Sequence, residues 1–199
     1  SLLIDQRGKT KILYEKNLND PLPIASLTKL MTALVTLKYE SQEQKIIITK
    51  EAVQKEENFG QLKAGEELTA RDLLFIMLIE SSNDAAVALA STLGEKSFLS
   101  LMNLETSQLD LSQTSFADVA GVDPDHEGEG INVSSAKDLA NLALFIRENY
   151  PEIFEILQIP QLDLYTSNGK FHHALKNTNE LLTKNGWPRL KLLSRDEHA

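Results

Sequence analysis

The strongest constraint on the fold is a helical segment that begins near Ala25 and is apolar around most of its circumference. Pro21 and Pro23 precede it, and prolines disfavour the interior of a helix, so we expect the helix to start close to Ala25. From Leu30 to Leu37 nearly every residue is apolar, which predicts a helix that is buried on most sides. The rest of the chain must therefore pack around this segment.

Two reactive side chains stand at the start of this helix. Ser26 and Lys29 are three positions apart, so a helix places the hydroxyl and the amine on one face. The pair can act as a nucleophile and its base, and free backbone N–H groups in a first turn can stabilise an oxyanion. Because a lysine in water is protonated, this chemistry needs a largely dry pocket. Taken alone, however, a Ser-x-x-Lys spacing more often marks an ordinary helical serine and lysine.

A second polar group separates two further apolar helices. Residues 69–72 have the form of a capping box, and the run over 73–79 is too apolar for a surface helix. Residues 81–83, Ser-Ser-Asn, follow at once and lead into another apolar helix. Each unpaired buried polar group costs about 1–3 kcal/mol, so these side chains need partners. They could simply cap the next helix, but the presence of both motifs favours Ser81 and Asn83 lining the pocket of the serine–lysine pair.

The remaining pattern predicts hairpins near both ends of the chain and helices between them. The predicted elements are a hairpin over 2–14, a strand over 45–49, turns over 51–65, helices over 84–90 and 95–109, a loop over 114–130, a helix over 139–149 opened by a capping box at 135–138 and ended by Pro151, and a hairpin turning at 167–170. His172 and His173 should lie on opposite faces of a strand, which makes them poor joint metal ligands. Residues 187–199 show no clear structural period.

Composition excludes several classes of function. The 199 residues are 42% hydrophobic and 25% charged, typical of a soluble globular protein with one domain or two closely packed ones. The net charge of -9 argues against nucleic acid as a partner. The absence of cysteine rules out disulfides and a thiol nucleophile. No apolar run is long enough for a transmembrane segment, and no signal peptide is visible.

The acidic loop over 114–130 does not match the spacing of a calcium-binding EF-hand loop, so a solvated loop is favoured. His126 in this loop has no second His or Cys at a metal-binding spacing. We therefore expect no metal site and no cofactor.

The two motifs and their surroundings resemble the penicillin-binding D-alanyl-D-alanine carboxypeptidases, serine peptidases that trim peptidoglycan stem peptides. Similar segments follow in the family's order over about residues 2–185: Pro23–Thr32, Leu68–Leu74, Ser82–Ala90, Ser134–Ala140 and Asn177–Leu182. The resemblance implies an α/β fold of the β-lactamase/transpeptidase type, with an antiparallel sheet built from both chain ends and flanked by helices. It also implies a single penicillin-binding domain over 1–199, with a mainly helical part over about 30–145.

The resemblance also implies roles for individual residues. Ser26 matches the acylated nucleophile and Lys29 its base, while Ser81 matches a proton relay and Asn83 a ligand of the substrate amide. The implied reaction is attack on the penultimate D-Ala carbonyl, loss of the terminal D-Ala and hydrolysis of the acyl-enzyme. β-Lactams would acylate the same serine. An extracytoplasmic location, periplasmic or in the cell envelope, follows from the peptidoglycan substrate.

The family's third motif, Lys-Thr-Gly, does not occur in this sequence. Lys191 is the nearest candidate by position for this substrate-binding lysine, but Leu192 and Leu193 follow it and offer neither the hydroxyl nor the glycine. We expect either a truncated chain whose C-terminal strands are missing or a natural departure that has lost the carboxylate site. Either case predicts very low turnover of a D-Ala-D-Ala peptide by these 199 residues.

Two alternative functions stay open. A serine β-lactamase shares the Ser-x-x-Lys start but needs a glutamate-held water for rapid deacylation, and no segment can be assigned to that glutamate. A catalytically impaired peptidoglycan-binding module would retain the fold without the chemistry. A long-lived penicillin adduct on Ser26 favours the carboxypeptidase, rapid release the β-lactamase, and no adduct the binding module.

Overall fold

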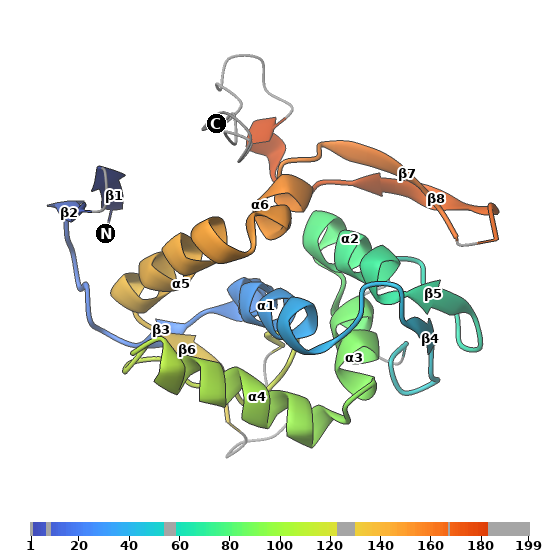
Figure 1. Ribbon diagram of the computed structural model, residues 1–199, viewed down its shortest axis with the longest axis horizontal. Coiled ribbons are helices and arrows are strands. Elements are labelled where there is room, and N and C mark those ends of the chain that lie inside the picture. Colours follow the sequence, from blue (N-terminus) through green and yellow to red (C-terminus); the bar gives the residue numbers. More distant parts are fainter. Residues whose placement is uncertain (1, 7–8, 54–58, 123–129, 167, 183–199) are drawn as a thin grey trace, which may run out of the picture.

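Helix α1 (Lys29–Tyr39) lies at the centre of a cluster of helices in the computed structural model, which describes residues 2–6, 9–53, 59–122, 130–166 and 168–182 (Figure 1). The helices around it are α2 (Ala70–Glu80), α3 (Asn83–Ser91), α4 (Glu95–Gln108), α5 (Ala136–Asn149) and α6 (Pro151–Leu157). Helix α1 contacts all five of them. Met31 and Leu34 are completely buried, which confirms the predicted core helix.

The serine-bearing turn that precedes α1 is tighter than an α-helix. Residues Ala25–Thr28 form a 3-10 turn, η1, and the α-helix starts only at Lys29. Strand β3 (Leu22–Pro23) pairs with β6 (Val133–Ser134) immediately before this turn. Ala25 then takes a φ of 44°, so the chain bends sharply out of the strand pair. The predicted helix start near Ala25 is thus a 3-10 turn that leads into the helix.

The strands form small antiparallel pairs. Besides β3 and β6, they are β1 (Leu2–Gln6) with β2 (Lys9–Tyr14), β4 (Lys45–Ile47) with β5 (Glu67–Thr69), and β7 (Gln161–Tyr165) with β8 (Phe171–Lys176). The α/β class and both predicted hairpins are confirmed. Within the described residues, however, no strand pairing links the two hairpins. They lie on different sides of the helices (Figure 1). The expected single sheet from both chain ends is therefore not found there.

The helix ends follow side-chain capping. Thr69 and Asp72 form the predicted capping box at the start of α2. Ser135 caps α5, but the Asp138 carboxylate accepts hydrogen bonds from the Gln113 N–H and the Thr114 hydroxyl, so the second predicted box is only half correct. Pro151 does more than end α5, since it occupies the first turn of the unpredicted helix α6.

The β7–β8 hairpin docks on the end of α2. The Thr178 N–H donates to the Ile79 carbonyl at 3.1 Å, and His173 Nε2 lies 2.9 Å from a Glu80 carboxylate oxygen. Strand β8 carries one extra residue at His172, where the pairing register shifts. This bulge breaks the alternation of faces, so the rings of His172 and His173 meet with centroids 4.7 Å apart. The expectation that these two rings lie on opposite faces is wrong.

Candidate active site

The amine of Lys29 is the centre of the candidate active site. Lys29 is only 3% exposed, and its Nζ lies 2.9 Å from Ser26 Oγ and 2.7 Å from Asn83 Oδ1. A third contact, at 2.8 Å, joins Nζ to the backbone carbonyl of Ala120. A hydroxyl, a side-chain amide and a backbone carbonyl from three distant segments thus surround one buried amine.

Ser26 differs from Lys29 in being exposed to solvent. Its place in the η1 turn, after the positive φ of Ala25, holds the hydroxyl above the buried amine. A substrate can therefore reach the Ser26 oxygen while the Lys29 amine stays largely dry. This is the environment that a serine nucleophile with a lysine base requires.

Three residues at the polar junction between α2 and α3 have different structural roles. Ser81 ends α2 in the left-handed conformation, with a φ of 61°. Ser82 is fully buried, accepts from the Ala85 N–H and donates to the Phe59 carbonyl, so it is the helix cap. This arrangement leaves Asn83, the first residue of α3, directed at the Lys29 amine. Capping of α3 and contact with the Lys29 amine are thus both present, on the neighbouring residues Ser82 and Asn83.

A cavity of about 460 Å³ opens beside Ser26. Ser26, Lys29 and Ser81 provide polar groups in its wall, and apolar side chains from η1, α1, α2, α5 and α6 form most of the rest. The lining residues are Ile24, Ala25, Ser26, Leu27, Lys29, Leu30, Met77, Leu78, Ser81, Ala143, Phe154, Leu157 and Thr178. Ser81 and Ser26 therefore share one cavity. Lys191 lies outside the described residues.

Sequence reasoning missed the turn at residues 117–122, here called the Asp118 turn. Asp118 Oδ1 accepts hydrogen bonds from the backbone N–H groups of Ala120, Gly121 and Val122. This part of the predicted solvated loop is therefore an ordered turn that presents the Ala120 carbonyl to Lys29. The Asp-x-x-Gly spacing is a turn pattern that could have suggested it. Residues 123–129 lie outside the described residues. They contain the loop's other acidic side chains and His126.

Burial has a marked effect on the carboxyl group that follows Asn83. Asp84 is 3% exposed, and one of its oxygens has no hydrogen-bond partner within the described part of the chain. Desolvation raises the pKa of Asp84 from 3.8 to about 6. The start of α3 therefore carries a carboxylate that is costly to ionise.

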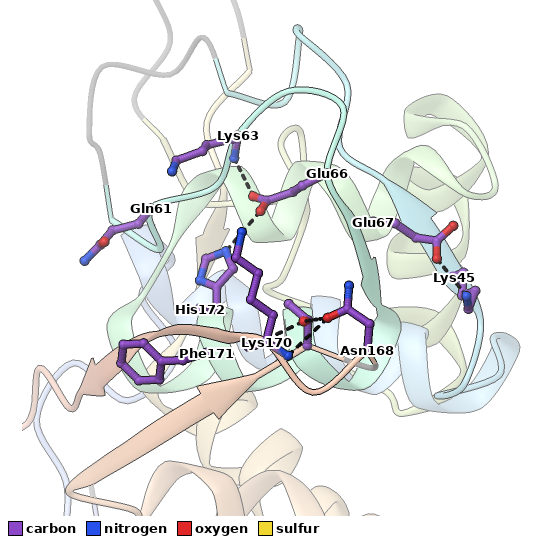
Figure 2. Close-up of a pocket in the computed structure, with 10 residues that line it drawn as sticks. Lys45, Gln61, Lys63, Glu66, Glu67, Asn168, Lys170, Phe171 and His172 are labelled. Carbon is purple, nitrogen blue, oxygen red and sulfur yellow. Dashed lines mark hydrogen bonds and ion pairs between the residues drawn. The ribbon is translucent and has the colours of Figure 1, made fainter.

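A second cavity, of about 490 Å³, lies between the β4–β5 pair and the turn of the β7–β8 hairpin, and Figure 2 shows the Glu66 carboxylate between Lys63 and His172. Glu66 Oε2 lies 3.1 Å from His172 Nε2, and Lys45 pairs with Glu67 at 2.7 Å. This cavity shares no lining residue with the cavity at Ser26. Among the described residues no cluster of three or more His, Cys, Asp or Glu side chains is arranged to hold a metal ion.

Comparisons with known proteins bear on nearly the whole chain. The Peptidase_S11 family, described as D-alanyl-D-alanine carboxypeptidase, matches residues 1–190. A D-alanyl-D-alanine endopeptidase of Pseudomonas aeruginosa is 30% identical over 191 residues, which cover 94% of this chain and 59% of that protein. The chain therefore spans a little over half the length of this relative.

Solved structures agree with the family match. A D-alanyl-D-alanine carboxypeptidase from Mycobacterium tuberculosis superposes with a TM-score of 0.79 at 29% identity, covering 90% of this chain and 65% of that one. Penicillin-binding protein D2 of Listeria monocytogenes, in its ampicillin-bound form, gives a TM-score of 0.69 at 32% identity, covering 88% and 69%. The fold is therefore that of the penicillin-binding peptidases. None of the helices described could cross a bilayer, being too short or too polar.

Proposed function

The chain belongs to the Peptidase_S11 family of D-alanyl-D-alanine carboxypeptidases, and from this premise we propose that it is a serine-type hydrolase of the D-Ala-D-Ala bond in peptidoglycan stem peptides. The observation that carries the proposal is the contact of 2.9 Å between the buried Lys29 amine and the exposed Ser26 hydroxyl. Residues 1–199 would form a single domain for this reaction, with its mainly helical part over about 30–145.

The three contacts of Lys29 fit a general base. A neutral amine has two N–H donors and one lone pair. The carbonyl oxygens of Asn83 and Ala120 can only accept hydrogen bonds, so each of them takes one of the two N–H groups. The lone pair can then accept the Ser26 hydroxyl proton across the contact of 2.9 Å. As the amine takes this proton, Ser26 Oγ bonds to the carbonyl carbon of the penultimate D-Ala.

Collapse of the tetrahedral adduct on Ser26 then expels the leaving group and completes acylation. The C–N bond to the terminal D-Ala breaks, and the leaving nitrogen receives the proton from the Lys29 ammonium, with the Ser81 hydroxyl as relay. Water then hydrolyses the ester: its oxygen bonds to the acyl carbon, the bond to Ser26 Oγ breaks, and Oγ regains a proton from the water. Asn83 holds the substrate amide next to the amine that its Oδ1 already contacts. No metal or cofactor takes part in this proposal.

β-Lactams are proposed as acylating inhibitors, because they would react with the same hydroxyl. The ampicillin-bound form of the Listeria penicillin-binding protein supports this. A peptidoglycan substrate places the reaction outside the cytoplasm, so we propose an extracytoplasmic location. The Pseudomonas relative is named an endopeptidase, which makes a D-Ala bond within a longer peptide a second candidate substrate.

The sequence has no Lys-Thr-Gly motif, which in this family would bind the terminal carboxylate. We therefore expect these 199 residues to release D-Ala from a stem peptide very slowly. Ordinary carboxypeptidase rates from these 199 residues would contradict this expectation.

Labelling with a fluorescent penicillin tests the proposal. We expect the unaltered chain to form a covalent adduct, Ser26→Ala to form none, and Lys29→Met to react roughly 100-fold or more slowly because its base is lost. Lys96→Met, on the exposed surface of α4, is the control and should react normally. Equal labelling of Ser26→Ala would contradict the proposal. Rapid release of the adduct would instead identify a β-lactamase, and a folded chain that never labels would identify a binding module.

A further inference from the structure

Asn132 is a buried side chain close to the serine-bearing turn and outside both sequence motifs. It immediately precedes β6, and its backbone carbonyl accepts from the Ile24 N–H at 3.2 Å. Asn132 is only 3% exposed. A buried amide at such a place must find partners for all its polar atoms.

The Asn132 amide has four partners. Its Nδ2 donates to Thr28 Oγ1 and to the Asp118 carbonyl, both at 2.8 Å. Its Oδ1 accepts from the N–H groups of Ala117 at 2.7 Å and Asp118 at 2.9 Å. These contacts use both donors and both acceptor sites of the side chain. Asn132 therefore fastens the first residues of the Asp118 turn to the residue that precedes Lys29.

The Asp118 turn connects Asn132 to the Lys29 amine. Asp118 Oδ1 fixes the turn through the N–H groups of Ala120 and Val122, at 2.8 and 3.0 Å. The Val119 carbonyl accepts from Thr32 Oγ1 at 2.6 Å, on the same helix as Lys29. The next carbonyl, that of Ala120, then accepts from the Lys29 Nζ.

We infer that Asn132 is a positioning residue for Lys29, acting through the Ala120 carbonyl. This inference rests on the proposed function, in which the lone pair of the amine must face Ser26. Without the Ala120 carbonyl, the N–H group that points at it would lose its acceptor, and the direction of the lone pair would be less firmly set. The Ala120 carbonyl fixes this direction together with Asn83 Oδ1, so the orientation of the base depends on the Asp118 turn.

Asn132→Asp tests the link with minimal change in shape. The carboxylate can still accept from the Ala117 and Asp118 N–H groups, but an oxygen replaces Nδ2 and faces the Asp118 carbonyl without a proton between them. The turn should move away and carry the Ala120 carbonyl with it. Lys29 would then lose the acceptor that the Ala120 carbonyl provides.

Asn103→Asp is the matched control. Asn103 on α4 donates through Nδ2 to the carbonyls of Leu99 and Phe116, at 3.0 and 2.8 Å, and accepts from the Phe116 N–H at 2.9 Å. It holds the same loop one residue earlier, but it contacts neither Lys29 nor a partner of Lys29. Both variants should lose thermal stability to a similar extent.

Two measurements separate positioning from a structural role. The first is the acylation rate constant at saturating benzylpenicillin, which should fall roughly 10- to 100-fold in Asn132→Asp and stay within about twofold in Asn103→Asp. The second is the 13C resonance of the Lys29 Cε atom in lysine-labelled protein, which should shift only in Asn132→Asp. This resonance tests the inference even if the unaltered chain forms no adduct, an outcome that would count against the proposed function alone.

Equal acylation constants and equal Lys29 resonances in the two variants would overturn the inference. If Asn132→Asp does not fold, Thr28→Val removes the Thr28 acceptor from Asn132 with almost no change in volume. The same shift of the Lys29 resonance is expected there. An unchanged resonance in a folded Thr28→Val variant would likewise overturn the inference.

Discussion

The exposed hydroxyl of Ser26 and the buried amine of Lys29 differ in environment as their proposed roles require. The nucleophile must meet a substrate, whereas the base must stay away from water. A single turn of chain separates the exposed serine from the buried lysine, because η1 ends at Thr28 and the buried helix α1 begins at Lys29. The backbone around this turn is correspondingly tight, and single residues there should be intolerant of change.

Gly121→Ala should displace the turn that carries Ser26. A Cβ atom at Gly121 would lie 2.0 Å from the Ala25 carbonyl oxygen, and Gly121 has a φ of 80°. Gly94 has the same φ but no heavy atom within 4 Å of its Cβ position, so Gly94→Ala carries the conformational penalty without the clash. We expect Gly121→Ala to lose about 1–3 kcal/mol more unfolding free energy than Gly94→Ala in urea titrations. Equal losses would show that the close approach to Ala25 is not rigid.

Asp84→Asn should stabilise the protein at neutral pH. Because burial raises the pKa of Asp84 from 3.8 to about 6, the folded state binds more protons than the unfolded state between these values. This group therefore lowers the unfolding free energy as pH rises from 3.8 to about 6. Removing the charge should raise that free energy at pH 7 by about 1–3 kcal/mol and flatten its pH dependence.

Asp163→Asn, on the exposed edge of β7, removes the same charge without relieving any burial. It should leave the unfolding free energy at pH 7 within about 0.5 kcal/mol of the unaltered chain. A profile of Asp84→Asn that matches the unaltered chain would contradict the assigned pKa.

At the scale of elements, the site depends on how the ends of helices meet. Helices α2 and α3 join through a left-handed Ser81 and a buried capping Ser82, which turns Asn83 toward α1. The β7–β8 hairpin packs on the same end of α2. Contacts of this hairpin should therefore influence the junction that bears Ser81.

Glu80→Ala should loosen the hairpin. The Glu80 carboxylate accepts from the Lys176 N–H at 3.2 Å and lies 2.9 Å from His173 Nε2. Its loss should cost about 1–2 kcal/mol and speed hydrogen exchange at the Lys176 amide. Glu67→Ala, which breaks the exposed pair with Lys45, should cost at most about 0.5 kcal/mol. Unchanged exchange at Lys176 in Glu80→Ala would mean that the hairpin is held by its other contacts.

Long elements could be predicted from the sequence, and among the short ones the strand expected over 45–49 is found as β4. The apolar period identifies α1 and α2, and the Asn168-Gly169 pair identifies the hairpin turn. Strand pairs of two residues, such as β3 with β6, are too short to show a period. The Ala120 carbonyl could not be predicted as a contact of Lys29, since every residue offers the same backbone group. The bulge at His172 could not be predicted either, because no residue type in this strand marks where its register shifts.

At the scale of the whole molecule, helices α2 to α6 of the described residues pack around α1, and Asn83 and Ala120, 54 and 91 positions from Lys29, both contact its amine. The family match over residues 1–190 confirms the resemblance inferred from the two motifs and the class of fold that it implies. The roles of Ser26, Lys29, Ser81, Asn83 and Lys191 stay predictions, as do the domain limits. All the chemistry proposed here depends on one covalent event at Ser26.

Peptide mapping after treatment with benzylpenicillin tests that event most directly. Trypsin cleaves after Lys16 and Lys29, which releases a peptide of residues 17–29 whose only serine is Ser26. We expect the penicilloyl mass on this peptide in the unaltered chain and on no peptide of Ser26→Ala. An adduct on the peptide that contains Ser81 and Ser82, or an adduct that persists in Ser26→Ala, would contradict the assignment of Ser26 as the nucleophile.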